Sequence, residues 1–241
     1  MLLIAVYVFL AFFCVALMQK KVLLDPSLIV IPCVLIVPQS LASIANLYVN
    51  LLPACAVLAM VTIITYRQTL QIESVTRFAA GSGLGAFVAL QVLALGINAH
   101  YLLVLLLIAS LGAVAVLFGR LNLSACYASP LSLMAGLGVG VVHFISLTSG
   151  RAFLPVNSPG ASAVVWLVSI IGALVGVLAL PNASMFVFDP EVIIASLMAV
   201  LLGTLVSRHI NSNQFESKVL SAIVLVMMLS VWGHVCVQYF W

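Results

Sequence analysis

The chain has 241 residues, of which 66% are hydrophobic and only 5% are charged. Because about a quarter of the residues of a soluble domain are charged, this composition excludes a soluble protein. It indicates an integral membrane protein with a single membrane domain over residues 1–241. The formal net charge of +3 comes from residues that nearly all lie between apolar runs, so it reports membrane topology and predicts no nucleic-acid partner.

Apolar runs of helical length follow one another along the chain, separated by polar or turn-rich breaks. They cover residues 2–18, 26–46, 51–66, 78–97, 101–118, 130–149, 162–180, 191–207 and 219–239. The sequence therefore predicts an all-α, polytopic transmembrane helical bundle of eight or nine spans, surrounded by lipid.

Helical hairpins begin near Met1, Leu51 and Tyr101, at a spacing of about fifty residues. In each hairpin, a loop that carries Lys or Arg joins two apolar runs. A fourth copy begins near Asp189, after an additional run at residues 162–180 that breaks the register. The sequence thus predicts a bundle built partly from imperfect hairpin repeats.

Basic residues of the first half lie in the odd-numbered loops: Lys20, Lys21, Arg67, Arg77 and Arg120. By the positive-inside rule these loops are cytoplasmic and the N-terminus is external. Nine full spans would then place the basic loop at residues 208–218 outside, and Asp189 and Glu191 inside. We therefore expect one late segment to cross only in part, near Pro155, Pro159 and Gly160. The choice between eight and nine spans stays open.

Two apolar runs carry the same glycine pattern. Gly136, Gly138 and Gly140 lie in the run at residues 130–149, and Gly81, Gly83 and Gly85 repeat the triplet 55 positions earlier. The small-x-x-x-small pairs are Gly81/Gly85, Gly136/Gly140 and Gly172/Gly176. Such pairs let two helix backbones approach closely in a membrane, so they predict a compact bundle.

Two histidines are candidate metal ligands. His143 shares a helical face with Gly136 and Gly140, and Val88 stands at its position in the earlier copy. An imidazole inside a span can bind a metal, carry a proton or form a hydrogen bond between helices. His234 has Cys236 two positions on, but residues two apart do not share a helical face, so a structural role is favoured there.

The run from Met134 to Leu147 resembles the repeated motif of MHYT-type membrane sensor domains. In that motif a Gly-x-Gly-hydrophobic stretch leads into Met-His-Tyr/Phe-x-Gly-Met. His143 and Phe144 fall on its histidine and aromatic residue, and His234 aligns more loosely. The resemblance implies a non-enzymatic signalling module of the bacterial inner membrane that binds copper and senses a diatomic gas. Its signal would pass to another membrane or signalling protein.

Two other functions fit the same sequence. A small-solute transporter or channel-like subunit would use a polar path along Gln39, Asn46, Gln91 and His143. The few charged residues within the spans favour passive over ion-coupled transport. The chain could also be a structural subunit of a larger membrane complex.

Overall fold

The structure is a computed structural model. It describes residues 2–18, 30, 44–69, 72–95, 101, 103–105, 107–108, 111, 132–145, 159–180, 186–209, 226, 229–230 and 232–238. This part of the chain contains helices and short connections and no β-strand, which confirms the all-α class.

Six α-helices carry the described fold. They are α1 (Leu2–Met18), α3 (Ile44–Thr65), α4 (Ile72–Ala94), α7 (Ser132–Ile145), α8 (Pro159–Leu178) and α9 (Pro190–His209). A short 3₁₀ turn, η2 (Arg67–Thr69), follows α3. The bounds of α1 match the predicted run, whereas α3 starts at Ile44 instead of Leu51 because tertiary hydrogen bonds satisfy Asn46 and Asn50 in its first turns.

Four helices are long and apolar enough to cross a membrane. They are Asn46–Thr65 of α3, Val75–Ala94 of α4, Gly160–Leu178 of α8 and Pro190–His209 of α9. This finding supports an integral membrane protein. α7 has 14 described residues, fewer than the roughly 20 that span a bilayer. The predicted runs at residues 26–46, 101–118 and 219–239 lie largely outside the described residues, so the predicted eight or nine spans stay a prediction.

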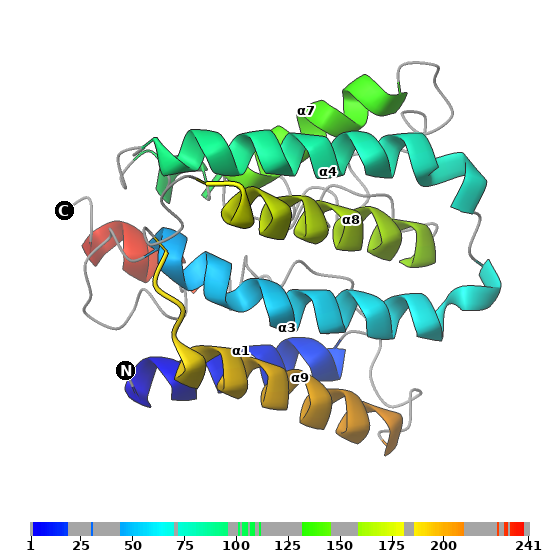
Figure 1. Cartoon of the computed structure of the whole chain (residues 1–241). Coiled ribbons are helices and arrows are strands. Elements are labelled where there is room, and N and C mark those ends of the chain that lie inside the picture. Colours follow the sequence, from blue (N-terminus) through cyan, green and yellow to red (C-terminus); the bar gives the residue numbers. More distant parts are fainter. Residues whose placement is uncertain are drawn as a thin grey trace.

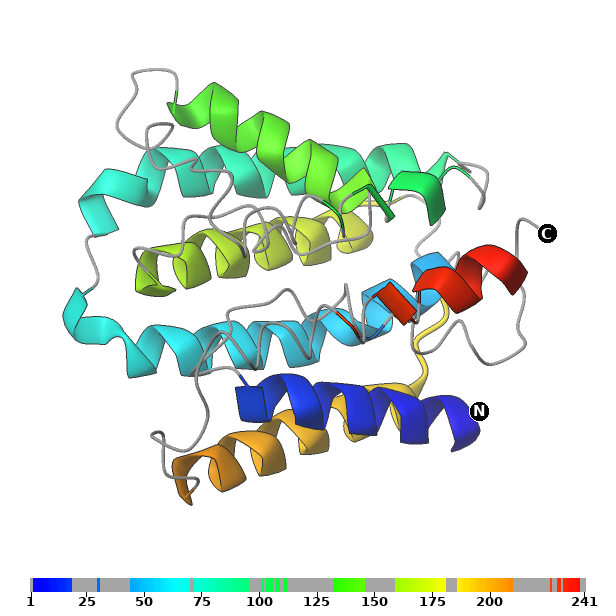
Figure 2. The same cartoon turned by 180° about the vertical axis from the view of Figure 1, so that it is seen from behind.

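The helices pack in an order that differs from their order in the chain. α8 lies between α4 and α3, α7 covers another side of α4, and α1 lies beside α9 (Figures 1 and 2). α3 and α4 are joined through η2 but do not form a packed pair, because α8 separates them. The connection of the second predicted hairpin is thus present, with α8 packed between its two helices.

Contacts between the helices fix their directions. Ser82 and Gln91 of α4 bond Ser169 and Gly176 of α8 in the same order, so α4 and α8 are parallel. α3 begins beside the segment that precedes α9 and ends beside the end of α9. α1, α3 and α9 thus form one parallel group, and α4, α7 and α8 run the opposite way (Figure 1).

The directions of the helices determine at which end of the bundle their charged residues lie. Arg67, Arg208 and His209 lie where α3 and α9 end, which we call the basic end, and Asp189 and Glu191 lie where α9 begins. This separation agrees with the positive-inside rule. α7 and α8 are also parallel to each other, so Ile145 and Pro159 lie toward opposite ends of the bundle.

The sequence predicts that a late segment near Pro155, Pro159 and Gly160 crosses only in part, and most of the interval before α8 lies outside the described residues. Pro155 lies outside the described residues. Pro159 and Gly160 do not interrupt a helix; they start α8, which is continuous over 20 residues. Proline is well tolerated in the first turn of a helix because its missing N–H has no intrahelical partner there.

Aromatic side chains fill the centre of the bundle. The largest fully buried side chains include Phe12 of α1, Tyr48 of α3, Phe144 of α7 and Trp166 of α8. By contrast, α9 exposes large apolar side chains along its length: Ile194, Met198, Leu201, Leu202, Leu205 and Val206. This surface of α9 is suited to contact lipid tails.

Candidate functional site

α4 and α7 touch backbone to backbone at their glycines. A methyl group on Gly85 would lie 2.9 Å from the backbone nitrogen of Val141, and one on Gly140 would lie 2.9 Å from that of Ala86. Methyl groups on Gly81 and Gly136 would overlap the carbonyl oxygens of the facing helix. The predicted packing role of both glycine pairs is confirmed.

These contacts are reciprocal under the 55-residue repeat. Gly81 meets Leu133 while Gly136 meets Phe78, and each partner lies three residues before the glycine of its own helix. Contacts that match in this way follow from a local twofold axis between two parallel helices. The two glycine-rich runs are therefore structural repeats that pair with each other.

A second close contact joins α4 to α8. A methyl group on Gly83 would lie 2.9 Å from Val168 Cγ1, and one on Gly172 would overlap the backbone of Gly83. Gly176 packs against the Leu90 side chain, where a methyl group would lie 2.9 Å from Cδ2. The third predicted glycine pair is thus also a packing face.

Buried hydroxyl groups reinforce the α4–α8 contact. The hydroxyl oxygens of Ser82 and Ser169 are 2.5 Å apart, and Ser169 Oγ also lies 2.9 Å from the Val165 carbonyl oxygen. Ser169 has one hydroxyl hydrogen, which it donates to Val165, so Ser82 donates to Ser169. Sequence analysis did not single out this pair, since serine is common in apolar helices and only the fold shows that the two face each other.

His143 lies in the last turn of α7, and its side chain is outside the described part of the structure. The next residue, Phe144, is fully buried and packs edge-to-face on Tyr48 of α3, with ring centroids 5.6 Å apart. The candidate motif thus falls where α7 reaches the core beside α3.

The second candidate ligand, His234, is exposed on a helical stretch at residues 232–238, and Cys236 is half-buried. Among the residues that the structure describes, no three His, Cys, Asp or Glu side chains gather closely enough to hold a metal ion. The side chain of His143 is not among them, so the copper site that the resemblance implies stays a prediction.

A polar cluster ties α3 to the start of α9. Asn50 is buried and donates to the carbonyl oxygens of Asn46, at 2.8 Å, and Val187, at 2.9 Å. Its own oxygen accepts from the backbone N–H of Asp189 at 2.8 Å. Asp189 in turn caps α9 by accepting from the N–H of Glu191 at 3.0 Å. Sequence analysis missed Asn50, which lies between two of the predicted apolar runs; an amide so close to apolar residues was the signal for it.

The proposed polar path is used for structure in its described part. Asn46 accepts a long bond, 3.4 Å, from the Val187 N–H, and Gln91 donates to the Gly176 carbonyl at 3.0 Å. Both join separate segments of the bundle. Gln39 lies outside the described residues, as does the His143 side chain.

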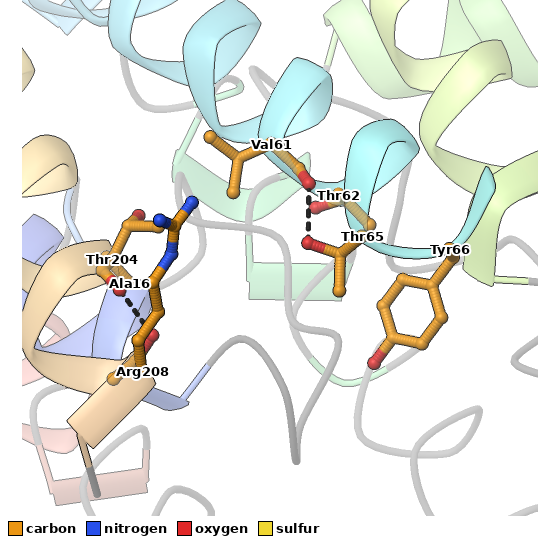
Figure 3. Close-up of a pocket in the computed structure, with 8 residues that line it drawn as sticks. Ala16, Val61, Thr62, Thr65, Tyr66, Thr204 and Arg208 are labelled. Atoms are coloured by element: carbon orange, nitrogen blue, oxygen red, sulfur yellow. Dashed lines mark hydrogen bonds between the residues drawn. The ribbon is translucent and has the colours of Figure 1, made fainter.

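A cavity of about 40 Å³ opens at the basic end, with room for a few water molecules. It is lined by Ala16, Val61, Thr62, Thr65, Tyr66, Thr204, Ser207 and Arg208. Thr62, Thr65 and Ser207 donate their hydroxyl hydrogens to carbonyls of their own helices. Figure 3 shows the Arg208 guanidinium extending from α9 toward α3. Because α1, α3 and α9 all end here, their dipoles favour this cation over a bound anion.

Comparison of the chain with protein-family models, with curated proteins and with solved structures gives no match.

Proposed function

We propose that the chain is a multi-pass membrane sensor or signalling module of the MHYT type, with His143 as its central polar residue. The observation that supports it is the position of the motif helix. α7 meets α4 through backbone contacts at four glycines, and Phe144, next to His143, is buried against Tyr48 of α3. A ligand bound at the end of α7 would thus act on the core of the bundle.

The glycine contacts would transmit such an event. No side chains separate the backbones of α4 and α7 at these glycines, so a shift of α7 would move α4 directly. α4 carries Gly83 and Ser82 against α8, which extends the coupling to a third helix. The output would then pass to a partner protein in or at the membrane.

Substitution of His143 tests this function. The purified wild type, His143→Gln and His143→Leu are compared for bound metal and for melting temperature in detergent. If the imidazole binds a metal, the wild type retains it and both variants lose it while they stay folded. If the imidazole only forms a hydrogen bond to a neighbouring helix, His143→Gln keeps the wild-type melting temperature. His143→Leu then lowers the free energy of unfolding by about 1 kcal/mol.

His209→Gln is the matched control, because His209 is exposed at the end of α9, away from the motif. It should behave as the wild type. Wild-type metal content and stability in both His143 variants would remove His143 from the site and the sensor function with it. A folded wild type without metal would favour the transporter or the structural subunit.

A further inference from the structure

A proline inside α3 divides this helix into two segments. Pro53 lies near the middle of its 22 residues, and the helix continues through it. Because proline has no backbone N–H, the carbonyl oxygen of Val49 lacks the intrahelical donor that any other residue would supply at position 53. Bending α3 at this point therefore costs less than bending it elsewhere.

The first segment of α3, Ile44–Leu52, is attached to two other parts of the bundle. Tyr48 packs edge-to-face on Phe144 in the last turn of α7. Asn50 donates to the Val187 carbonyl and accepts from the Asp189 N–H, just before α9. Residues 47–52 are all buried, and they cover more than one helical turn, so this segment is enclosed on every side.

The second segment, residues 54–65, is attached at the other end of α9. Thr62 and Thr65 line the cavity at the basic end together with Ser207 and Arg208 of α9. α9 itself is a continuous helix from Pro190 to His209. The two ends of α9 thus contact different segments of α3, and Pro53 lies between the two attachments.

We propose that Pro53 is a hinge, and that the first segment of α3 turns on it and couples the end of α7 to the start of α9. A displacement of Phe144 moves Tyr48 and, on the same short segment, Asn50. The Asn50 amide then carries Val187 and Asp189 with it. The attachments at the basic end stay in place. This coupling goes beyond the proposed sensor function, because it requires no particular ligand at His143.

Hydrogen exchange of the purified protein in detergent tests the coupling. Phe144→Leu keeps an apolar side chain and removes the ring contact with Tyr48, which is worth about fivefold in a local opening equilibrium. Backbone exchange at residues 187–192 should accelerate by about this factor, and exchange at residues 203–207 should stay unchanged. Tyr48→Leu removes the same contact from α3 and should give the same pattern.

Phe78→Leu is the matched control for the loss of a buried ring. Phe78 is 3% exposed and belongs to a separate apolar cluster, formed by α4 and α8. Its substitution should leave exchange at residues 187–192 as in the wild type. Acceleration there in Phe78→Leu as large as in Phe144→Leu would show general loosening of the bundle and would overturn the proposal.

Pro53→Ala tests the hinge itself. Alanine supplies the missing N–H, so the Val49 carbonyl can accept an intrahelical bond and the two segments become one stiffer helix. In this background Phe144→Leu should accelerate exchange at residues 187–192 by less than about twofold, because the second segment then also holds the first in place. Pro159→Ala is the control, since the first residue of α8 has no intrahelical acceptor for its N–H. It should preserve the full acceleration.

Three results would contradict the hinge. Exchange at residues 187–192 could be unchanged in both Phe144→Leu and Tyr48→Leu, which would exclude the coupling. Equal acceleration at both ends of α9 would show that the whole helix responds. An undiminished effect in the Pro53→Ala background would show that the proline plays no part.

Discussion

Single polar side chains hold helices together in this bundle where lipid removes the usual hydrophobic drive for helix association. The Ser82 and Ser169 hydroxyls form a directed chain that ends at the Val165 carbonyl, and both serines are almost fully buried. This direction has an energetic consequence, because the two hydroxyls are not equivalent. Ser169 is both donor and acceptor, whereas Ser82 donates to it.

Alanine substitutions should reveal this asymmetry. Ser82→Ala leaves the Ser169–Val165 bond intact and should lower the free energy of unfolding by about 0.5 kcal/mol. Ser169→Ala leaves the buried Ser82 hydroxyl without its acceptor and should cost about 1–2 kcal/mol. The free energy of unfolding of the double variant should be close to that of Ser169→Ala or slightly higher. Reversible unfolding in mixed micelles measures all three, and a larger loss for Ser82→Ala than for Ser169→Ala would contradict the assigned direction.

At the scale of elements, α3 shows how a tertiary partner extends a helix. Its first turns contain Asn46 and Asn50, which interrupt the apolar run, and both amides bond the backbone of the segment that leads into α9. These hydrogen bonds hold Asp189 where it caps α9. Residue 50 therefore joins the start of one helix to the start of another.

Asn50→Leu should loosen the start of α9. It leaves the Val187 carbonyl and the Asp189 N–H without their partner, a loss of about 1–3 kcal/mol. Backbone hydrogen exchange at residues 187–192 should accelerate, while exchange in the middle of α4 stays unchanged. Asn46→Ala is the control, since its longer bond to an exposed N–H should matter less. Unchanged exchange in Asn50→Leu would exclude this role.

At the scale of the whole molecule, two groups of parallel helices run in opposite directions, and the acidic and basic residues of α9 lie at its opposite ends. The basic end holds Arg67 and Arg208, and the opposite end holds Asp189 and Glu191. Strict alternation of nine spans would have mixed these ends.

Labelling from either side of the membrane tests this arrangement. Cysteines at Gln68 and His209, both exposed at the basic end, should react only from the cytoplasm. A cysteine at Val187, 64% exposed at the opposite end, should react only from outside. If His209→Cys reacted from the side of Val187→Cys, α9 would not run parallel to α3 in the membrane.

Much of the fold could be predicted because it depends on local pattern. Low charge and long apolar runs determine the membrane class, and the run at residues 2–18 is helical with the predicted ends. Glycines four residues apart lie on one helical face in any fold, so their packing role followed from spacing alone. The role of His143 stays a prediction.

Only the tertiary structure decided which surfaces meet. Gly83 and Gly138 have the same local pattern, yet Gly83 is buried under α8 and Gly138 contacts no other helix in the described part of the chain, because burial depends on a helix far away in the sequence. The position of α8 between α3 and α4, and the parallel directions of α7 and α8, follow from contacts such as Ser82–Ser169. Hydropathy reports how strongly each segment prefers lipid, and it carries no information about which neighbour that segment packs against.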